Sequence, residues 1–190
     1  MTRKRGPRSD ALANDERILR AAARVLAEDP RATIQRIADE AGVVRLTVYR
    51  RFADREALRR AIFRAGAEEA ERVLAETAAA GLGVMESLRL LIVSMAAIAE
   101  RYPLLYVEVD PVRPATREGR PVPRSLRAAV TALVEQGKAE GVLRADIPTE
   151  LLPLAVVGTL RAARRFGSGD PRRTGELVAE LVLSGFTPRT

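Results

Sequence analysis

The sequence lacks two residue types on which much protein chemistry depends, because none of its 190 residues is a histidine or a cysteine. This excludes disulfide bonds, thiolate nucleophiles, imidazole bases, ordinary zinc sites and haem ligation through either side chain. A metal site made of carboxylates alone stays possible, but the spaced Asp/Asn pattern of a calcium loop does not occur. We therefore expect no metal ion and no cofactor, and any catalysis is left to Ser, Lys or Asp/Glu.

Aromatic residues and long apolar runs are also scarce. Aromatics make up 4% of the chain, tryptophan is absent, and Ala and Leu dominate the apolar set, which favours helix over sheet. The longest apolar stretch, Leu90–Ala99, is too short to span a bilayer. The charged segment Met1–Asp10 lacks the apolar core of a signal peptide. We expect a cytoplasmic protein with no membrane partner.

Positive charge is concentrated in the first third of the chain. The net charge is +7, from 32 Lys and Arg against 25 Asp and Glu. Residues 1–60 hold 15 of the basic and 9 of the acidic residues, a net of +6, which leaves +1 for residues 61–190. A basic segment of this kind indicates an anionic partner such as nucleic acid. Only 2 of the 32 basic residues are lysines, and a GC-rich coding sequence explains that ratio more simply than selection for phosphate contacts.

Apolar residues follow helical spacing through the whole chain, and no strand pattern of convincing length appears. Residues 1–10 are expected to form a basic arm in which Gly6 and Pro7 block a helix. Asn14 is a candidate N-cap for the first helix, and the proline-rich stretch 110–123 predicts a long, mobile loop. The predicted fold class is all-α, with helices at about 11–28, 33–41, 45–51, 54–79, 85–101, 124–140, 150–166 and 172–185 and a short segment after Pro103.

Two of these helices form a predicted helix-turn-helix over Thr33–Phe52. Thr33 can cap the first helix, and Gly42 can supply the left-handed turn after it that a Cβ would penalise. Ala38 is small where the two helices must cross closely, and Asp54 can cap the long helix that follows. On the outer face of the second helix this arrangement leaves Arg45, Leu46, Thr47, Arg50 and Arg51. Such a set can read bases and bind phosphates.

The motif resembles the DNA-binding segment of the TetR family of bacterial repressors. The shared residues and spacings are Thr33, Ile37-Ala38, Ala41-Gly42-Val43, Tyr49 with Phe52, and Glu56-Ala57-Leu58. The match runs from Ile18 to Leu58. It departs from the family pattern at Val44, where a capping Ser is usual, at Leu46, where Gly, Ala or Pro is usual, and at Arg51, where His is common. These departures leave the base preference open.

The resemblance implies a role for each outward-facing residue. Arg45 and Thr47 are expected to contact bases and Tyr49 a phosphate. Thr33 either caps its helix only or also touches a phosphate. Two simpler interpretations stay open, in which Tyr49 is a core aromatic and Arg50 a solvated surface residue. The full expected DNA-binding set is Thr33, Arg45, Leu46, Thr47, Tyr49, Arg50, Arg51 and Arg55.

The resemblance also implies three parts and a symmetric assembly. Residues 1–10 would be the basic arm, 11–58 the DNA-binding domain, and 59–190 a bundle for ligand binding and dimerisation. A homodimer would place its two recognition helices about 34–36 Å apart on a palindromic operator. The expected dimer interface is Leu152, Val156, Leu160, Leu177, Val178, Leu181 and Val182, and the expected effector cavity is lined by Leu88, Ile92, Met95, Tyr102 and Tyr106. The alternative for both sets is that they close the core of a single chain.

We therefore expect a transcriptional regulator, a repressor that an unknown small-molecule effector releases from double-stranded DNA. Enzymatic functions fit poorly. Gly81-Leu82-Gly83 is a fragment of a nucleotide-binding pattern, but no strand precedes it and a helix break explains it better. The alternative from another class is a helical adaptor or nucleoid-type protein that binds DNA without sequence preference and takes no effector.

Overall fold

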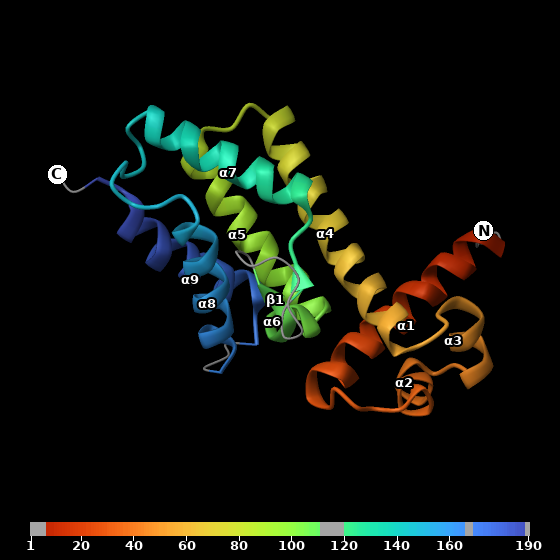
Figure 1. The fold of residues 1–190 in the computed structure, drawn as a ribbon. Coiled ribbons are helices and arrows are strands. Elements are labelled where there is room, and N and C mark those ends of the chain that lie inside the picture. Colours follow the sequence, from red (N-terminus) through yellow and green to blue (C-terminus); the bar gives the residue numbers. More distant parts are fainter. Residues whose placement is uncertain (1–6, 111–119, 166–168, 189–190) are drawn as a thin grey trace. The chain divides into compact units, whose positions relative to one another are not determined.

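The chain is built almost wholly of helices, which confirms the all-α prediction (Figure 1). The structure is a computed structural model that describes residues 7–110, 120–165 and 169–188. Residues 111–119 of the expected mobile loop lie outside that part, and the two-residue strands at its ends pair in parallel. The elements are α1 (Pro7–Glu28), α2 (Ile34–Ala41), α3 (Arg45–Arg51), α4 (Arg55–Ala79), α5 (Val84–Arg101), α6 (Leu104–Glu108), β1 (Val109–Asp110), β2 (Arg120–Pro121), α7 (Arg124–Ala139), α8 (Leu151–Arg165) and α9 (Pro171–Phe186).

Internal contacts divide the chain into two compact units. The first takes in the chain as far as Ala65 together with Arg101–Leu105, and the second takes in Gly66–Glu100 and the chain from Tyr106 onward. Helix α4 therefore begins in the first unit and ends in the second. The functional division that the sequence predicts after residue 58 stays a prediction.

The first unit is held together by an apolar core beneath α2. This helix buries four of its eight residues at the spacing that one helix face requires. Arg55 of α4 donates a hydrogen bond to the carbonyl of Ala32 at 3.4 Å. Arg59 does the same to Pro30 at 3.0 Å, so α4 is tied to the loop between α1 and α2. The buried side chains of this unit include Ile18, Ala22, Val25, Leu26, Ile34, Ile37, Ala38, Ala41, Val48, Leu58 and Ile62.

Helix α1 begins earlier than the sequence predicts. Its first residue is Pro7, so residues 7–10 belong to the helix and not to an arm, and Asn14 lies inside the helix. Proline suits the first helical position, because its fixed φ is helical and the N–H that it lacks would have no partner there. The Asn14 side chain instead accepts a hydrogen bond from Arg17 at 2.7 Å. Residues 1–6, the rest of the expected arm, lie outside the described residues.

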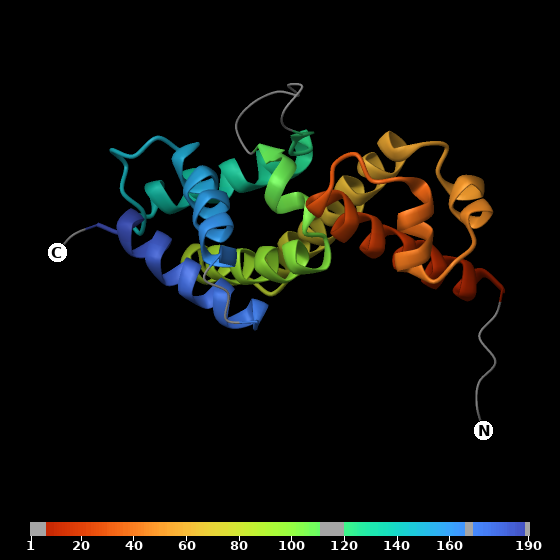
Figure 2. The ribbon, with the colours of Figure 1, turned by 90° about the horizontal axis from the view of Figure 1, so that it is seen from below.

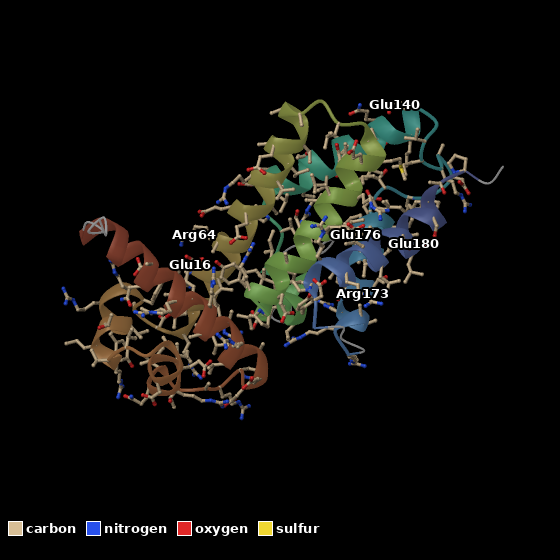
Figure 3. All side chains as sticks on the ribbon, turned by 180° about the vertical axis from the view of Figure 1, so that it is seen from behind. Glu16, Arg64, Glu140, Arg173, Glu176 and Glu180 are labelled. Carbon is tan, nitrogen blue, oxygen red and sulfur yellow. The ribbon has the colours of Figure 1, made fainter. Side chains whose placement is uncertain are left out.

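The second unit packs α5, α7, α8 and α9 around a larger apolar core, with α8 and α9 side by side in Figures 1 and 2. Arg89 of α5 pairs with Glu176 of α9 at 2.5 Å. Glu176 follows Arg173 and precedes Glu180 along α9 (Figure 3). The core residues are Val84, Leu88, Ile92, Ala96, Ala99, Tyr106, Val134, Leu143, Leu152, Val156, Leu160, Val178, Ala179, Val182 and Leu183.

Helix α9 passes unusually close to α5 at Gly175, which is buried. A Cβ at this position would lie 2.7 Å from the Cα atom of Val93 and 3.1 Å from its carbonyl oxygen. Both are backbone atoms, which a single side chain cannot displace without shifting a helix. Glycine is therefore required for the approach of these two helices.

We expect Gly175→Ala to lower the free energy of unfolding by about 1–3 kcal/mol, because it overpacks the contact with α5. Gly158 of α8 is the matched control, since it is exposed and a Cβ there would meet nothing within 4 Å. Gly158→Ala should raise stability by about 0.5–1 kcal/mol, because alanine is the better helix former. Urea unfolding of both variants measures the difference, and equal effects would contradict the close approach.

Candidate functional site

Helices α2 and α3 are joined by a tight left-handed turn. The Thr33 side-chain oxygen accepts a hydrogen bond from the backbone N–H of Arg36 at 3.2 Å, which confirms the predicted cap of α2. Gly42 follows α2 with φ +63° and donates to the carbonyl of Asp39 at 3.1 Å. Two of the last carbonyls of α2 are thus satisfied, since Val43 donates to Ala38 at 3.0 Å. The predicted helix-turn-helix is present.

The N-terminus of α3 has no side-chain cap. Val44 occupies the capping position with an extended backbone, φ −74° and ψ 145°, and no side-chain atom bonds the free N–H groups of the first turn. Its apolar side chain is 70% exposed, so burial does not compensate. The absence of the usual Ser left two possibilities, a cap from another residue or no cap, and the described residues show no cap.

Helix α3 turns one residue inward and most others outward. Val48 is fully buried, whereas Arg45, Leu46, Tyr49 and Arg50 are exposed. Leu46 is 67% and Tyr49 41% exposed, both high values for large apolar side chains. The interpretation of Tyr49 as a core aromatic is therefore wrong. The outer face of α3 is a mixed cationic, apolar and hydroxyl-bearing surface.

Arg45 and Tyr49 form a local pair on this face. The guanidinium of Arg45 donates to the Tyr49 hydroxyl at 3.1 Å, and its Cζ atom lies 5.1 Å from the centre of the ring. The two residues are one helical turn apart, which is the spacing at which side chains on a helix surface meet. The pair combines a hydrogen bond with a cation–π contact, and it orders both side chains before any ligand binds.

The three remaining arginines of the expected set differ in their surroundings. Arg51 pairs with Asp15 of α1 at 3.1 Å between its Nε atom and a carboxylate oxygen, so it ties α3 to α1. Arg55 donates to the Ala32 carbonyl as described above. Arg50 is exposed, and within the described part of the chain no hydrogen bond or ion pair involves its side chain. Of the three, Arg50 is the most available to an external anion.

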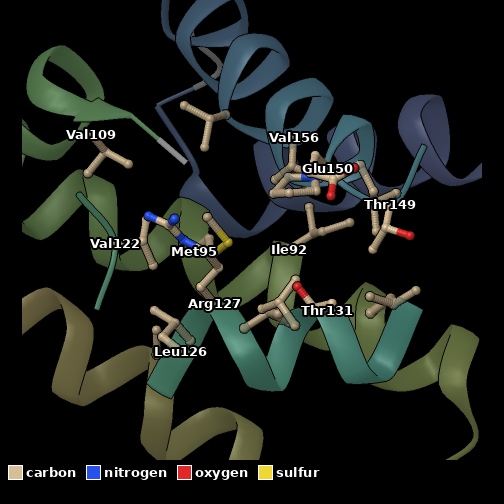
Figure 4. A pocket seen from close by; sticks show the side chains of 17 residues that line it. Ile92, Met95, Val109, Val122, Leu126, Arg127, Thr131, Thr149, Glu150 and Val156 are labelled. Carbon is tan, nitrogen blue, oxygen red and sulfur yellow. The ribbon is translucent and has the colours of Figure 1, made fainter. Parts of the chain in front are cut away.

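The second unit encloses a cavity of about 370 Å³ between α5, α7 and α8 (Figure 4). Leu88, Ile92 and Met95 of the expected effector set line it. Tyr102 and Tyr106 are both buried but are not among the described residues that line it. Tyr102 belongs to the first unit, so the expectation for these two tyrosines is corrected.

Tyr106 instead has a structural environment within the second unit. Its hydroxyl donates to the carbonyl of Ala96 at 3.4 Å, and the Arg164 guanidinium lies 5.3 Å from the ring centre. Burial raises the pKa of the Tyr106 hydroxyl above its ordinary value, and the negative charge of Glu100 adds to that effect while Arg164 opposes it. This tyrosine stays neutral and acts as packing.

Four polar residues line the cavity, and none of them is predicted from the sequence: Arg127, Thr131, Thr149 and Glu150. Thr149 is engaged at the edge, where its hydroxyl donates to Glu135 and accepts from Lys138 at 2.6 Å. The hydrogen bond from Thr149 lowers the pKa of Glu135, with Lys138 contributing in the same direction. A helical periodicity cannot reveal such residues, because the cavity forms only when three distant helices pack.

The expected dimer interface divides into two groups. Leu152, Val156, Leu160, Val178 and Val182 are buried in the core of their own chain, so they are not available to a second copy, and the expectation is corrected for them. Leu177 and Leu181 of α9 are 52% and 58% exposed. They lie along a groove of about 400 Å³ between α8 and α9 whose other walls include Thr159 and Ala162.

The described residues contain neither of two simple patterns, a cluster of acidic metal ligands or a membrane-spanning helix. Across 7–110, 120–165 and 169–188, no three or more acidic side chains come together as metal ligands. In the same ranges no helix is both long and apolar enough to cross a membrane. The candidate sites are thus an exposed basic helix and an apolar cavity.

Comparison with known proteins bears on both sites. Residues 18–62 match the family of bacterial regulatory proteins called the tetR family. No curated protein matches the chain. Among solved structures, the TetR family protein CprB from Streptomyces coelicolor A3(2) aligns with a TM-score of 0.70 at 21% identity, over 94% of this chain and 90% of that one. A TetR transcriptional regulator from S. coelicolor aligns at 29% identity and a TM-score of 0.55, over 93% and 99%.

A structure described as a gamma-butyrolactone receptor aligns with a TM-score of 0.62 at 21% identity, over 93% of this chain and 99% of that one. The helix-turn-helix and the helical second unit together define a bacterial DNA-binding regulator. Within that class, residues 18–62 match the tetR family, and the chain as a whole shares the fold of TetR regulators.

The uncapped start of α3 makes a gain in stability possible. We expect Val44→Ser to raise the free energy of unfolding by about 0.5–1 kcal/mol, because its hydroxyl can accept a free N–H of the first turn. Val44→Ala is the control, since it removes the same exposed side chain without supplying an acceptor. Thermal unfolding of both variants measures the difference. If Ser and Ala were equal, the N-terminus of α3 would already be satisfied in solution.

Proposed function

We propose that the protein is a repressor that binds a near-palindromic DNA operator as a homodimer and is released by a small-molecule effector. The observation that carries this proposal is the outer face of α3, where Arg45, Leu46, Tyr49 and Arg50 are exposed above a fully buried Val48. Large apolar and aromatic side chains exposed on a short, firmly anchored helix suit a macromolecular surface better than water. Their place in the basic third of the chain favours DNA.

Base contacts are assigned to the start of α3. Arg45 can offer two parallel donors to a guanine edge, and Thr47 can donate to or accept from either base of a pair. Leu46 is exposed enough to contact a thymine methyl group. The contact with Tyr49 holds the Arg45 guanidinium over the helix, so Arg45 must exchange part of that contact for the base.

Phosphate contacts are assigned to the residues around this helix. The Tyr49 hydroxyl and the Arg50 guanidinium are both exposed donors on the outer face of α3. Thr33 and Arg55 are also exposed, although each already serves a backbone group. Arg51 shares its charge with Asp15, so its contribution to phosphate binding should be smaller than that of Arg50.

Dimerisation is assigned to the exposed face of α8 and α9. Leu177 and Leu181 stand one turn apart on α9 beside an apolar groove. Two copies related by a two-fold axis could fill each other's groove with these leucines, because an isologous interface presents the same patch twice. The α3 helices of the two copies would then bind in successive turns of the major groove.

Effector binding is assigned to the cavity of the second unit. Among the similar proteins, one is described as a gamma-butyrolactone receptor and another as a ketosteroid transcriptional regulator of Mycobacterium tuberculosis. Helix α4 contributes Leu58 and Ile62 to the core of the first unit and Ala70 to the cavity wall. A ligand that favours one tilt of this continuous helix could lower operator affinity, with a coupling free energy of about 1–3 kcal/mol.

Selection of duplexes from a random pool tests the proposal. We expect the best duplex to be nearly palindromic and to bind about 10³-fold more tightly than random DNA. Affinity should fall steeply with salt, by about 0.9 log units per log unit of salt for each phosphate contact, because binding releases counterions. If random duplexes compete as well as the selected one, the adaptor or nucleoid-type alternative is correct.

Two arginines of α3 provide matched variants in this assay. Arg45→Ala should change which bases are preferred, at a cost of about 1–3 kcal/mol on the selected duplex. Arg50→Ala should weaken all duplexes about equally and reduce the salt slope by about one contact. The reverse pattern would mean that a different face of α3 meets the bases.

The exposed leucines of α9 give a separate prediction for assembly. The double variant Leu177→Glu/Leu181→Glu should be monomeric in analytical ultracentrifugation, because four carboxylates would face one another across the two-fold axis. Its affinity for the selected duplex should fall by about tenfold or more, since each half-site then binds alone. Leu90→Glu is the control, an equally polar change at a 43% exposed site of α5. A dimeric double variant would contradict this interface.

A further inference from the structure

The cavity of the second unit is apolar on almost every side. Thirteen of its 17 lining residues are aliphatic, Met or Pro side chains, and none is aromatic. A cavity of about 370 Å³ falls within the range of small-molecule sites. The wall therefore suits a ligand with a flexible or cyclic aliphatic body. The four polar residues of the lining determine which polar group the ligand can carry.

Arg127 is the one basic residue among the described residues that line the cavity. Its Nε atom is fully inaccessible to solvent and has no hydrogen-bond partner. Within the described part of the chain its side chain makes no hydrogen bond or ion pair. In Figure 4, Arg127 lies beside Met95 and Val122 at one end of the cavity. Thr149 and Glu150 lie at the opposite end. The Nε–H of this half-buried side chain thus has neither water nor a described protein acceptor beside the apolar wall.

A guanidinium is charged at every accessible pH and has five donors and no acceptor. A buried charge is costly unless a hydrogen-bonded partner of opposite charge accompanies it. No residue of the described part of the chain supplies such a partner for Arg127, and its Nε–H has no access to water, so the occupant of the cavity is left to supply the favourable complement. A carboxylate is the simplest group that accepts two parallel N–H donors and carries the opposite charge.

We propose that the cavity binds an amphipathic monoanion whose carboxylate pairs with Arg127 and whose aliphatic body lies against α5 and α8. This deepens the proposed function by naming the ligand class of the effector cavity, and only the effect of the ligand on DNA rests on that function. A ligand cation would have to pair with Glu150, but that residue is exposed and its carboxylate can stay hydrated. The asymmetry between a partnerless Arg127 and a hydrated Glu150 favours an anion.

Two trios of probe molecules test the charge preference independently of body shape. Decanoate is compared with decanol and decylamine, and 4-cyclohexylbutanoate with its alcohol and its amine, all below the concentrations at which micelles form. We expect at least one acid to bind the full-length protein about tenfold or more tightly than its matched alcohol, as measured by calorimetry. The matched amine should bind more weakly than the alcohol.

Variants of α7 assign the preference to one side chain. Arg127→Met should reduce the affinity for the acid to that for the alcohol, whereas Arg124→Met, an exposed arginine at the start of the same helix, should change neither. The melting temperature of ligand-free Arg127→Met should equal or exceed that of the parent, because an unpaired charge has been removed. If Arg127→Met does not fold, Arg127→Gln retains much of the shape and must lose the acid preference as well.

Several outcomes would overturn the proposal: no probe binds, the alcohol or amine of both trios binds as well as the acid, or the acid preference survives both Arg127 variants. Operator binding is measured on the same preparation without ligand. Specific DNA binding in a protein that shows no acid preference would remove the ligand class and leave the regulator intact. An acid preference in a protein that binds DNA without specificity would do the opposite.

Discussion

The left-handed backbone at Gly42 is the constraint on which the helix-turn-helix of α2 and α3 depends. With φ at +63°, the chain reverses within one residue after α2, and Gly42 and Val43 supply donors to its last carbonyls. An L side chain in this conformation costs about 1–2 kcal/mol. Because the turn is so short, α3 must start at once and place Val48 in the core. The opposite face, with Arg45 and Tyr49, is then exposed as a consequence of local geometry.

In the second unit the helices do not pack tightly everywhere, and a cavity is left between them. Where α5 and α9 meet, Gly175 permits contact between backbones, yet a cavity stays open between α5, α7 and α8. A well-packed core would gain stability by filling that volume with larger side chains. We expect the unfilled cavity to cost stability, and the Arg127 Nε–H that has no described partner to do the same. Such costs are typical of places where function and not packing decides the residues.

Features that short-range chemistry determines could be predicted from the sequence. The caps at Thr33 and Asp54 and the turn at Gly42 belong to this class, because a few consecutive residues decide each. The start of α1 was placed too late, since Pro7 is compatible both with stopping and with opening a helix. Helical periodicity could not decide which apolar face of α9 meets its own core, nor bring Arg127 to the cavity, because both depend on packing between distant helices.

Footprinting on the selected duplex is the most direct test of whether two copies of α3 bind two symmetric half-sites. Hydroxyl radicals cleave the DNA backbone wherever protein does not cover it. We expect two protected patches with two-fold symmetry, centred one helical turn apart. We also expect methylation of guanines in the major groove to interfere with binding within both patches. Uniform protection along the duplex, with no symmetric pattern, would contradict the account.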